Sequence, residues 1–285
     1  MPSSREIRRR IKSVQNIQQI TKAMKMVAAA RLRRAQEKAL ATKPYTDKMQ
    51  EILASVAASA GEAVHPLLTV RETKRVGYLV LSADKGLAGA YTSNLIREVV
   101  PQVQGRDDIG LMTAGRKARD YFRRRGYAID REYTGFSEKP SYDHAVMLAR
   151  DVAASFEAEE YDEIYLVYTR FHSPINQKPT TLKLLPVDTS EFQADSAATG
   201  QEMIFEPSAG EVLKYLLPKY LETVIYGALL QSAASELGSR MTAMSSATDN
   251  AQDLISKLIL NYNKVRQANI TREISEIVGG AEALK

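Results

Sequence analysis

Few residues in this chain have the types and spacing that a catalytic or metal site needs. The three histidines, His65, His144 and His172, lie far apart and lack the i, i+4 spacing of a helical metal pair, and the chain has no cysteine. No G-x-S-x-G or H-E-x-x-H motif occurs, and the carboxylates between Glu157 and Glu163 are typical of a solvated helix end. We therefore expect no catalytic residue, no metal and no cofactor, and we expect the histidines to have surface or packing roles.

Two loops with glycines invite comparison with nucleotide-binding motifs. The run from Gly86 to Gly89 contains one G-x-x-G but lacks the leading glycine of a dinucleotide fingerprint. The run from Gly110 to Lys117 is a near miss to a P-loop, with Arg116 where lysine belongs and without a correctly placed hydroxyl for magnesium. Turn and packing roles are the better interpretation. A nucleotide-dependent enzyme remains an alternative, which titration with ATP or NAD would test.

Positive charge is concentrated at the N-terminus. Residues 1–48 contain 13 Lys or Arg against 3 acidic residues, although the net charge of the whole chain is only +5. A solvated helix face, a nucleic-acid site or contact with an acidic protein surface would each explain this asymmetry. Residues 1–44 contain no aromatic side chain on which a base could stack. Contact with an acidic protein surface is therefore the favoured functional interpretation.

Two long helices at the chain ends would carry most of these residues. In the N-terminal segment, apolar residues recur at spacings of three and four until Pro44 interrupts them, and after a bend the helix should continue to about Ser59. A second helix should begin at a capping box at Ser208, and from Leu230 to Val265 apolar residues recur every seven positions, the period of a supercoiled helix. We expect the two helices to form an antiparallel coiled coil, with a kink or second start at Pro218.

The segment between the helices has a different period. Short β-rich runs, of which 75–82 and 162–168 are the clearest, alternate with segments typical of helices. This alternation predicts a small, doubly wound, Rossmann-like α/β domain inserted between the helices. Residues 193–200 are rich in Ala, Ser and Thr, and we expect a flexible connection there. The predicted domains are a coiled-coil helix over 1–60, the α/β domain over 75–190 and a second coiled-coil helix over 208–285.

The composition is that of a soluble protein. The chain has 285 residues, of which 44% are hydrophobic and 26% charged. No uninterrupted apolar run reaches 18 residues, and the basic N-terminus lacks the apolar core of a secretory signal. The lack of cysteine excludes a disulfide framework and favours a cytoplasmic setting without insertion into a membrane.

Several stretches resemble the family of ATP synthase gamma subunits. The run IRRRIKSVQNIQQITKAMKMVAA over residues 7–29 resembles the N-terminal signature of that family. The runs RMTAMSSATDNA over 240–251 and YNKVRQANITREI over 262–274 resemble its C-terminal signature, and SADKGLAG over 82–89 also matches the family. Because these runs occur in the family's order and span the whole chain, the resemblance is specific.

The resemblance implies a rotor. In that family the terminal helices form a bent antiparallel coiled coil inside a ring of alternating alpha and beta subunits, and the α/β domain lies outside, where the epsilon subunit and the membrane c-ring attach. The chain would be the non-catalytic shaft of a proton-translocating ATP synthase, coupling ion flow to conformational change at the beta subunits by rotation. It would be a peripheral protein at the cytoplasmic face of the cell membrane, without a nucleic-acid partner.

The resemblance also implies contact residues. Met24 and Lys25 match positions beside the acidic lever of the catalytic subunit, and Lys85 lies in a loop that is also placed near that lever. The polar positions that would contact the ring during rotation are Arg240, Gln267, Thr271 and Glu276, and the apolar tip that would turn at its top comprises Ile274, Ile277, Val278, Ala281 and Leu284. Neither a nucleotide-dependent enzyme nor a nucleic-acid-binding coiled coil explains both terminal signatures.

Overall fold

A computed structural model describes residues 4–59, 65–188, 205, 206 and 208–282. The chain divides into two compact units, one made of residues 1–28 with 241–285 and the other of residues 29–240. The connection predicted at 193–200 and Leu284 of the predicted tip lie outside the described residues. Among the helices of the described ranges, none is long and apolar enough to cross a membrane.

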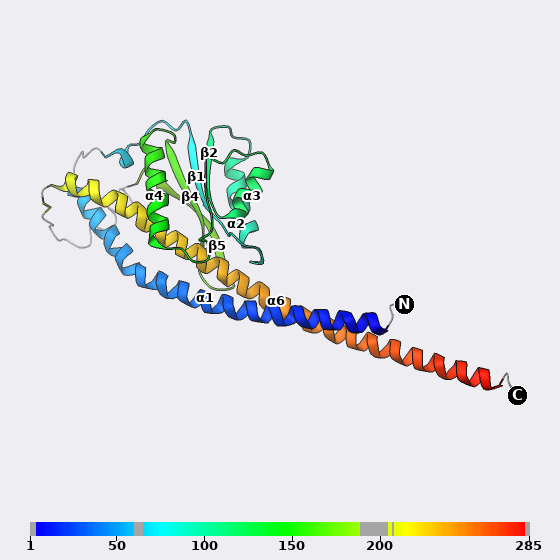
Figure 1. The fold of residues 1–285 in the computed structure, drawn as a ribbon. Coiled ribbons are helices and arrows are strands. Elements are labelled where there is room, and N and C mark those ends of the chain that lie inside the picture. The colour runs from blue at the N-terminus through cyan, green and yellow to red at the C-terminus, as the bar shows by residue number, and fades with distance from the viewer. Residues whose placement is uncertain (1–3, 60–64, 189–204, 207, 283–285) are drawn as a thin grey trace. The chain divides into compact units, whose positions relative to one another are not determined.

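Two long helices are present, as the apolar periodicities predict (Figure 1). Helix α1 spans Ser4–Ser59 and helix α6 spans Ala209–Glu282. The hydroxyl of Ser208 accepts a hydrogen bond from the backbone N–H of Glu211 at 3.3 Å, which confirms the Ser208 half of the predicted capping box. The carboxylate of Glu211 binds Lys214 at 2.6 Å.

Neither proline interrupts its helix. Helix α1 runs through Pro44 to Ser59, so the predicted continuation is confirmed, and helix α6 runs through Pro218, so of the kink or second start predicted there the second start does not occur. A proline removes one backbone hydrogen bond and strains the preceding turn. The turns next to Pro218 are held by the buried side chains of Leu217 and Leu221, whereas Lys43, Pro44 and Tyr45 of α1 are exposed. The burial of the two leucines contributes roughly 1.5–3 kcal/mol each, which offsets the local cost of Pro218.

A five-stranded sheet lies between the long helices in sequence. After a 3-10 helix η1 (Pro66–Leu68), the chain order is β1 (Val76–Leu81), α2 (Tyr91–Val103), β2 (Ile109–Ala114), α3 (Arg116–Arg124), β3 (Arg131–Tyr133), α4 (Tyr142–Glu157), β4 (Glu163–Phe171) and β5 (Gln177–Leu185). The strand order is β3-β2-β1-β4-β5, with only the β4–β5 pair antiparallel. The predicted Rossmann-like α/β fold is confirmed.

Helices cover both faces of this sheet (Figure 1). On one face, α2 and α3 pack on a cluster that includes Val80, Leu95 and Phe122. On the other face, α4 and parts of α1 and α6 share a larger cluster with the sheet, which includes Leu148 and Leu221. All six residues of β1 are consequently buried, as expected for a strand covered on both sides.

Helix α6 is also joined to β4 by polar contacts. The amide oxygen of Gln231 accepts a hydrogen bond from the backbone N–H of Phe171 at 3.0 Å, and the hydroxyl of Ser235 donates to the carbonyl of Thr169 at 3.0 Å. A Cβ at Gly238 would lie 3.2 Å from the ring of Phe171, so a glycine at this position permits the close approach of helix and strand. The α/β elements and this part of α6 therefore form one packed body.

The other unit is a pair of antiparallel helices. Hydrogen bonds join the side chains of Arg8 to Tyr262 (2.6 Å), Gln18 to Gln252 (2.8 Å), Thr21 to Thr248 (2.8 Å) and Lys25 to Ser245 (2.9 Å). Between the first and last of these pairs the α1 number rises by 17 while the α6 number falls by 17. Residues of the seven-residue repeat, such as Met244, Ala251 and Ile255, are buried. This constant register confirms the predicted antiparallel coiled coil.

Replacing Gly110 or Gly227 by alanine should change the free energy of unfolding in opposite directions. A Cβ at Gly110 in β2 would overlap the ring of Tyr161 and the carboxylate of Asp130, whereas a Cβ at Gly227 in α6 would meet no atom within 4 Å. We expect Gly110→Ala to lower the free energy of unfolding by about 1–3 kcal/mol. Gly227→Ala should raise it by about 0.5–1 kcal/mol because alanine favours the helix. Urea unfolding followed by circular dichroism measures both, and shifts of the same sign would contradict this account.

Candidate functional site

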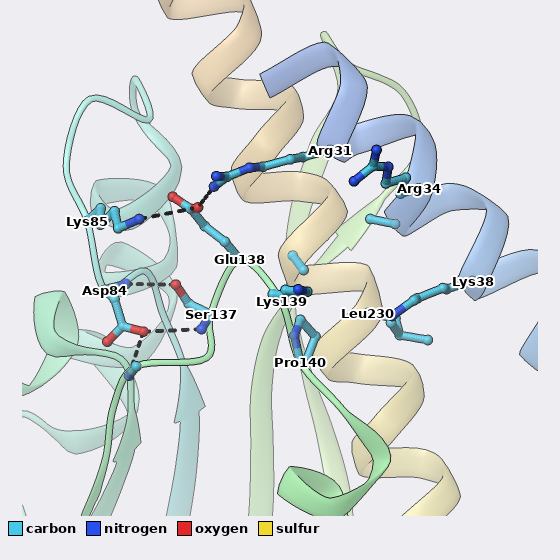
Figure 2. Close-up of a pocket in the computed structure, with 13 residues that line it drawn as sticks. Arg31, Arg34, Lys38, Asp84, Lys85, Ser137, Glu138, Lys139, Pro140 and Leu230 are labelled. Atoms are coloured by element: carbon cyan, nitrogen blue, oxygen red, sulfur yellow. Dashed lines mark hydrogen bonds and ion pairs between the residues drawn. The ribbon is translucent and has the colours of Figure 1, made fainter. Parts of the chain in front are cut away.

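Glu138, in the loop between β3 and α4, pairs with three cationic side chains in the described part of the chain. Its side chain is 12% exposed and forms ion pairs with Arg31 of α1, with Lys85 of the loop after β1 at 3.4 Å, and with Arg240 of α6 at 3.2 Å. Figure 2 shows Arg31 and Lys85 converging on this carboxylate. All four residues belong to the unit of residues 29–240. One carboxylate therefore joins two helices to two loops.

Arg240 forms a second buried ion pair within α6. Its guanidinium, in a side chain 7% exposed, donates to the carboxylate of Glu236 at 2.7 Å and to the carbonyl of Gly86 at 3.2 Å. Burial raises the pKa of the Glu236 carboxyl above its usual value, and the positive charge of Arg240 opposes this rise. Charge-assisted hydrogen bonds of this kind are stronger than neutral ones. Arg240 thus holds the Gly86 loop against α6.

Asp84 binds the N-terminus of α3, a position that could otherwise bind an anion. Its carboxylate accepts hydrogen bonds from the backbone N–H groups of Gly135 (2.8 Å), Ser137 (3.1 Å) and Arg116 (3.2 Å). Arg116 is the first residue of α3, and a helix N-terminus after a parallel strand is a favourable anion site. The chain's own carboxylate therefore occupies this anion site, and Figure 2 shows Asp84 bonded to the loop of Ser137.

Gly115 and His144 have structural roles. Gly115 has a φ of +114°, and a Cβ there would overlap the carbonyl of Ser82, so this glycine permits close contact with the end of β1. The ring of His144 accepts a hydrogen bond from the backbone N–H of Ser141 at 3.0 Å and stacks on Phe136. Within the described ranges, no group of three His, Cys, Asp or Glu side chains is placed to hold a metal ion.

The predicted contact residues fall into separate groups. Lys85 and Arg240 come together at Glu138. Met24 is half-buried in the helix pair, and Lys25 is exposed and donates a hydrogen bond to Ser245 at 2.9 Å. Whether any of them contacts another subunit stays a prediction.

The remaining predicted residues lie on the last turns of α6, which continue past the start of α1 (Figure 1). By the register of the helix pair, the residues after about Arg266 lie beyond Ser4, the first described residue of α1. Every described side chain from 270 to 281 is exposed. The set comprises the polar Gln267, Thr271 and Glu276 and the apolar Ile274 (56% exposed), Ile277 (71%), Val278 (61%) and Ala281. Their contacts with a partner remain a prediction.

Neither Glu138 nor Glu236 is predicted as a site residue from the sequence. A usable signal existed for Glu236, because it precedes Arg240 by four residues on a stretch of small and apolar side chains, and oppositely charged residues at this spacing meet on one helix face. No comparable signal marks Glu138, whose partners come from positions up to 107 residues away. Only the fold brings them together.

Comparisons with known proteins agree with one another. A family model described as ATP synthase matches residues 3–284. The ATP synthase gamma chain of Heliobacterium modesticaldum is 50% identical over the full length of both chains. A chain in the central stalk and c-ring structure of Tetrahymena thermophila mitochondrial ATP synthase is 26% identical, with a TM-score of 0.61 over 80% of this chain and 99% of that one. A chain of the Euglena gracilis mitochondrial ATP synthase, 19% identical, has the same fold, with a TM-score of 0.74 over 99% of this chain and 94% of its own.

Removing the charge of Glu138 should loosen the unit that it joins. Glu138→Gln keeps the shape of the side chain but deprives Arg31, Lys85 and Arg240 of their common anion. We expect a loss of about 1–3 kcal/mol in the free energy of unfolding, measured with urea. The matched control Glu273→Gln, at an exposed position of α6, should change it by less than about 0.5 kcal/mol. Equal effects of the two substitutions would contradict the role given to Glu138.

Proposed function

Because this chain belongs to the family of ATP synthase gamma chains, we propose that it is the central shaft of a proton-translocating ATP synthase and passes torque along its paired helices. In this role it couples ion flow through the membrane c-ring to conformational change at the catalytic beta subunits, by rotating inside the ring of alpha and beta subunits. Its partners are the alpha, beta and epsilon subunits and the c-ring.

The observation that carries this function is the constant antiparallel register of α1 and α6. A shaft transmits torque only if its strands do not slide past each other. The polar pairs from Arg8–Tyr262 to Lys25–Ser245 repeat along the helix pair and fix its register, and the apolar seam between them supplies most of the association free energy. A paired helix also resists twisting better than a single one.

Rotation must make identical catalytic sites differ in free energy. Moving a two-state site from 1:99 to 99:1 requires about 5.5 kcal/mol of differential interaction, and hydrogen bonds to charged groups contribute about 1.5–3 kcal/mol each. Two to four such contacts are therefore enough. Lys25 and Lys85, which are both exposed, suit contacts with an acidic lever on the beta subunits, and Met24 lies beside Lys25.

Arg240 fits an indirect role in this contact. Its guanidinium is bound to Glu236 and Glu138 within the chain, and it also holds the carbonyl of Gly86, next to Lys85. Arg240 would position the Lys85 loop for its partner. Gln267, Thr271 and Glu276, all exposed on α6, would make direct polar contacts with the ring.

The apolar end of α6 suits a bearing. Ile274, Ile277 and Val278 are exposed in this chain, and with Ala281 and Leu284 they would turn in an apolar sleeve at the top of the ring. Hydrophobic contact is non-directional, so its free energy changes little with rotation angle. A ring of hydrogen bonds would instead hold the shaft at preferred angles.

We assign the chemistry to the beta subunits. The acidic groups with the most specific surroundings, Asp84, Glu138 and Glu236, are all bound to backbone N–H groups or cations of this chain. The chain would act as a non-catalytic subunit and lie at the cytoplasmic face of the cell membrane, where the c-ring holds it as a peripheral component.

Co-purification with alpha and beta subunits tests this function. The full chain should form a stable complex with them, and ATP hydrolysis by the complex should exceed that of alpha and beta subunits without it. The chain alone should hydrolyse no ATP. A chain that turned over ATP unaided, or that failed to join the alpha and beta subunits, would contradict the proposal.

A disulfide between the helices tests whether they turn as one body. The chain has no cysteine, and the hydroxyls of Thr21 and Thr248 lie 2.8 Å apart, so the double variant Thr21→Cys with Thr248→Cys should form a disulfide on oxidation. ATP hydrolysis by the assembled complex should be unchanged after oxidation. The single variant Thr21→Cys is the control. A loss of hydrolysis that only the double variant shows, and that reductant reverses, would mean that the helices must slide.

A further inference from the structure

A cavity of about 420 Å³ opens beside Glu138, between α1, α6 and the loops after β1 and β3 (Figure 2). Its volume falls within the range of small-molecule sites in proteins. Five cationic side chains line it, together with the carboxylates of Asp84 and Glu138; the cations are Arg31, Arg34, Lys38, Lys85 and Lys139.

The two carboxylates are already used. The carboxylate of Asp84 accepts hydrogen bonds from three backbone N–H groups. The carboxylate of Glu138 forms ion pairs with Arg31, Lys85 and Arg240. The side chains of Arg34, Lys38 and Lys139 form no ion pair or hydrogen bond with any residue in the described part of the chain. The cavity therefore has an excess of three positive charges.

The placement of these charges is unfavourable without an anion. Arg34 and Lys38 are four residues apart on α1 and therefore share a helix face, where like charges repel each other. Lys139 approaches the same cavity from the loop before α4, as Figure 2 shows. Beneath them lies an apolar floor of three buried residues, Ala35, Leu230 and Ala233.

We propose that this cavity binds a small polyphosphate anion, with its phosphate oxygens between Arg34, Lys38 and Lys139. The planar guanidinium of Arg34 suits two parallel hydrogen bonds to one phosphate, and the two ammonium groups serve as point charges. If the anion is a nucleotide, its base can rest on the apolar floor, whereas inorganic pyrophosphate uses the cations alone. The site uses neither the glycine loops nor the N-terminus of α3, and it does not depend on the shaft function.

Titration calorimetry of the full chain with inorganic pyrophosphate tests the site. We expect saturable binding of one anion per chain that weakens as salt is added, because the three cations are exposed. The variant Arg34→Gln with Lys38→Gln and Lys139→Gln should bind about tenfold more weakly or worse. The matched control Lys257→Gln with Lys264→Gln and Arg266→Gln removes the same charge from exposed positions of α6 and should bind as the unchanged chain does.

Three results would overturn the proposal. These are no saturable binding of pyrophosphate, an equal loss of affinity in the cavity variant and the control, or binding of a poly-glutamate peptide in place of pyrophosphate. A parallel titration with ATP separates the two anion sources, because binding tighter than that of pyrophosphate means that the apolar floor contributes. Since the chain is titrated alone, the outcome is independent of its assembly with alpha and beta subunits.

Discussion

The structure depends on the antiparallel pairing of α1 and α6, because neither helix can bury its apolar stripe alone. In proteins, the packing of an apolar helix face supplies most of the stability of the helix. Because the two paired helices come from the two ends of the chain, the residues between Ser59 and Ala209 form a single insertion between them. The inserted α/β elements then add their own apolar face, and α4, α1 and α6 share a single buried cluster with the sheet.

The same packing changes what the Rossmann-like fold can do. In many α/β proteins the carboxyl ends of the parallel strands form a crevice that binds a ligand. Here Asp84 binds the N-terminus of α3, and the Gly86 loop is tied to Arg240 of α6. The loops at the carboxyl ends of these strands therefore contact α6. The loops at this edge of the sheet thereby hold the part of α6 that precedes Met241.

The sequence predicted the elements that are defined by local periodicity. The seven-residue repeat of α6 and the apolar run of β1 depend only on neighbouring residues, and both were confirmed. Where tertiary contacts determine the bounds or the continuity of an element, the prediction from the sequence was wrong or incomplete. Helix α6 continues past Pro218 because buried leucines on both sides of the proline stabilise it. Strand β4 continues to Phe171 because it pairs with β5 as far as Gln177. Glu138 has no local signature at all, because its three cations come from distant segments.

The exposed end of α6 has a consequence for the energetics of assembly. Its last turns, with Ile274, Ile277 and Val278, are exposed, so only local contacts within the helix stabilise them in the described part of the chain, including the ion pair of Arg272 with Glu276 at 3.5 Å. Any surface that covers them must both order these turns and remove apolar area from water. Such coupled ordering and burial gives a negative heat capacity of association. The enthalpy of forming the complex will therefore become more favourable as the temperature rises, and calorimetry at a single temperature would misjudge what drives it.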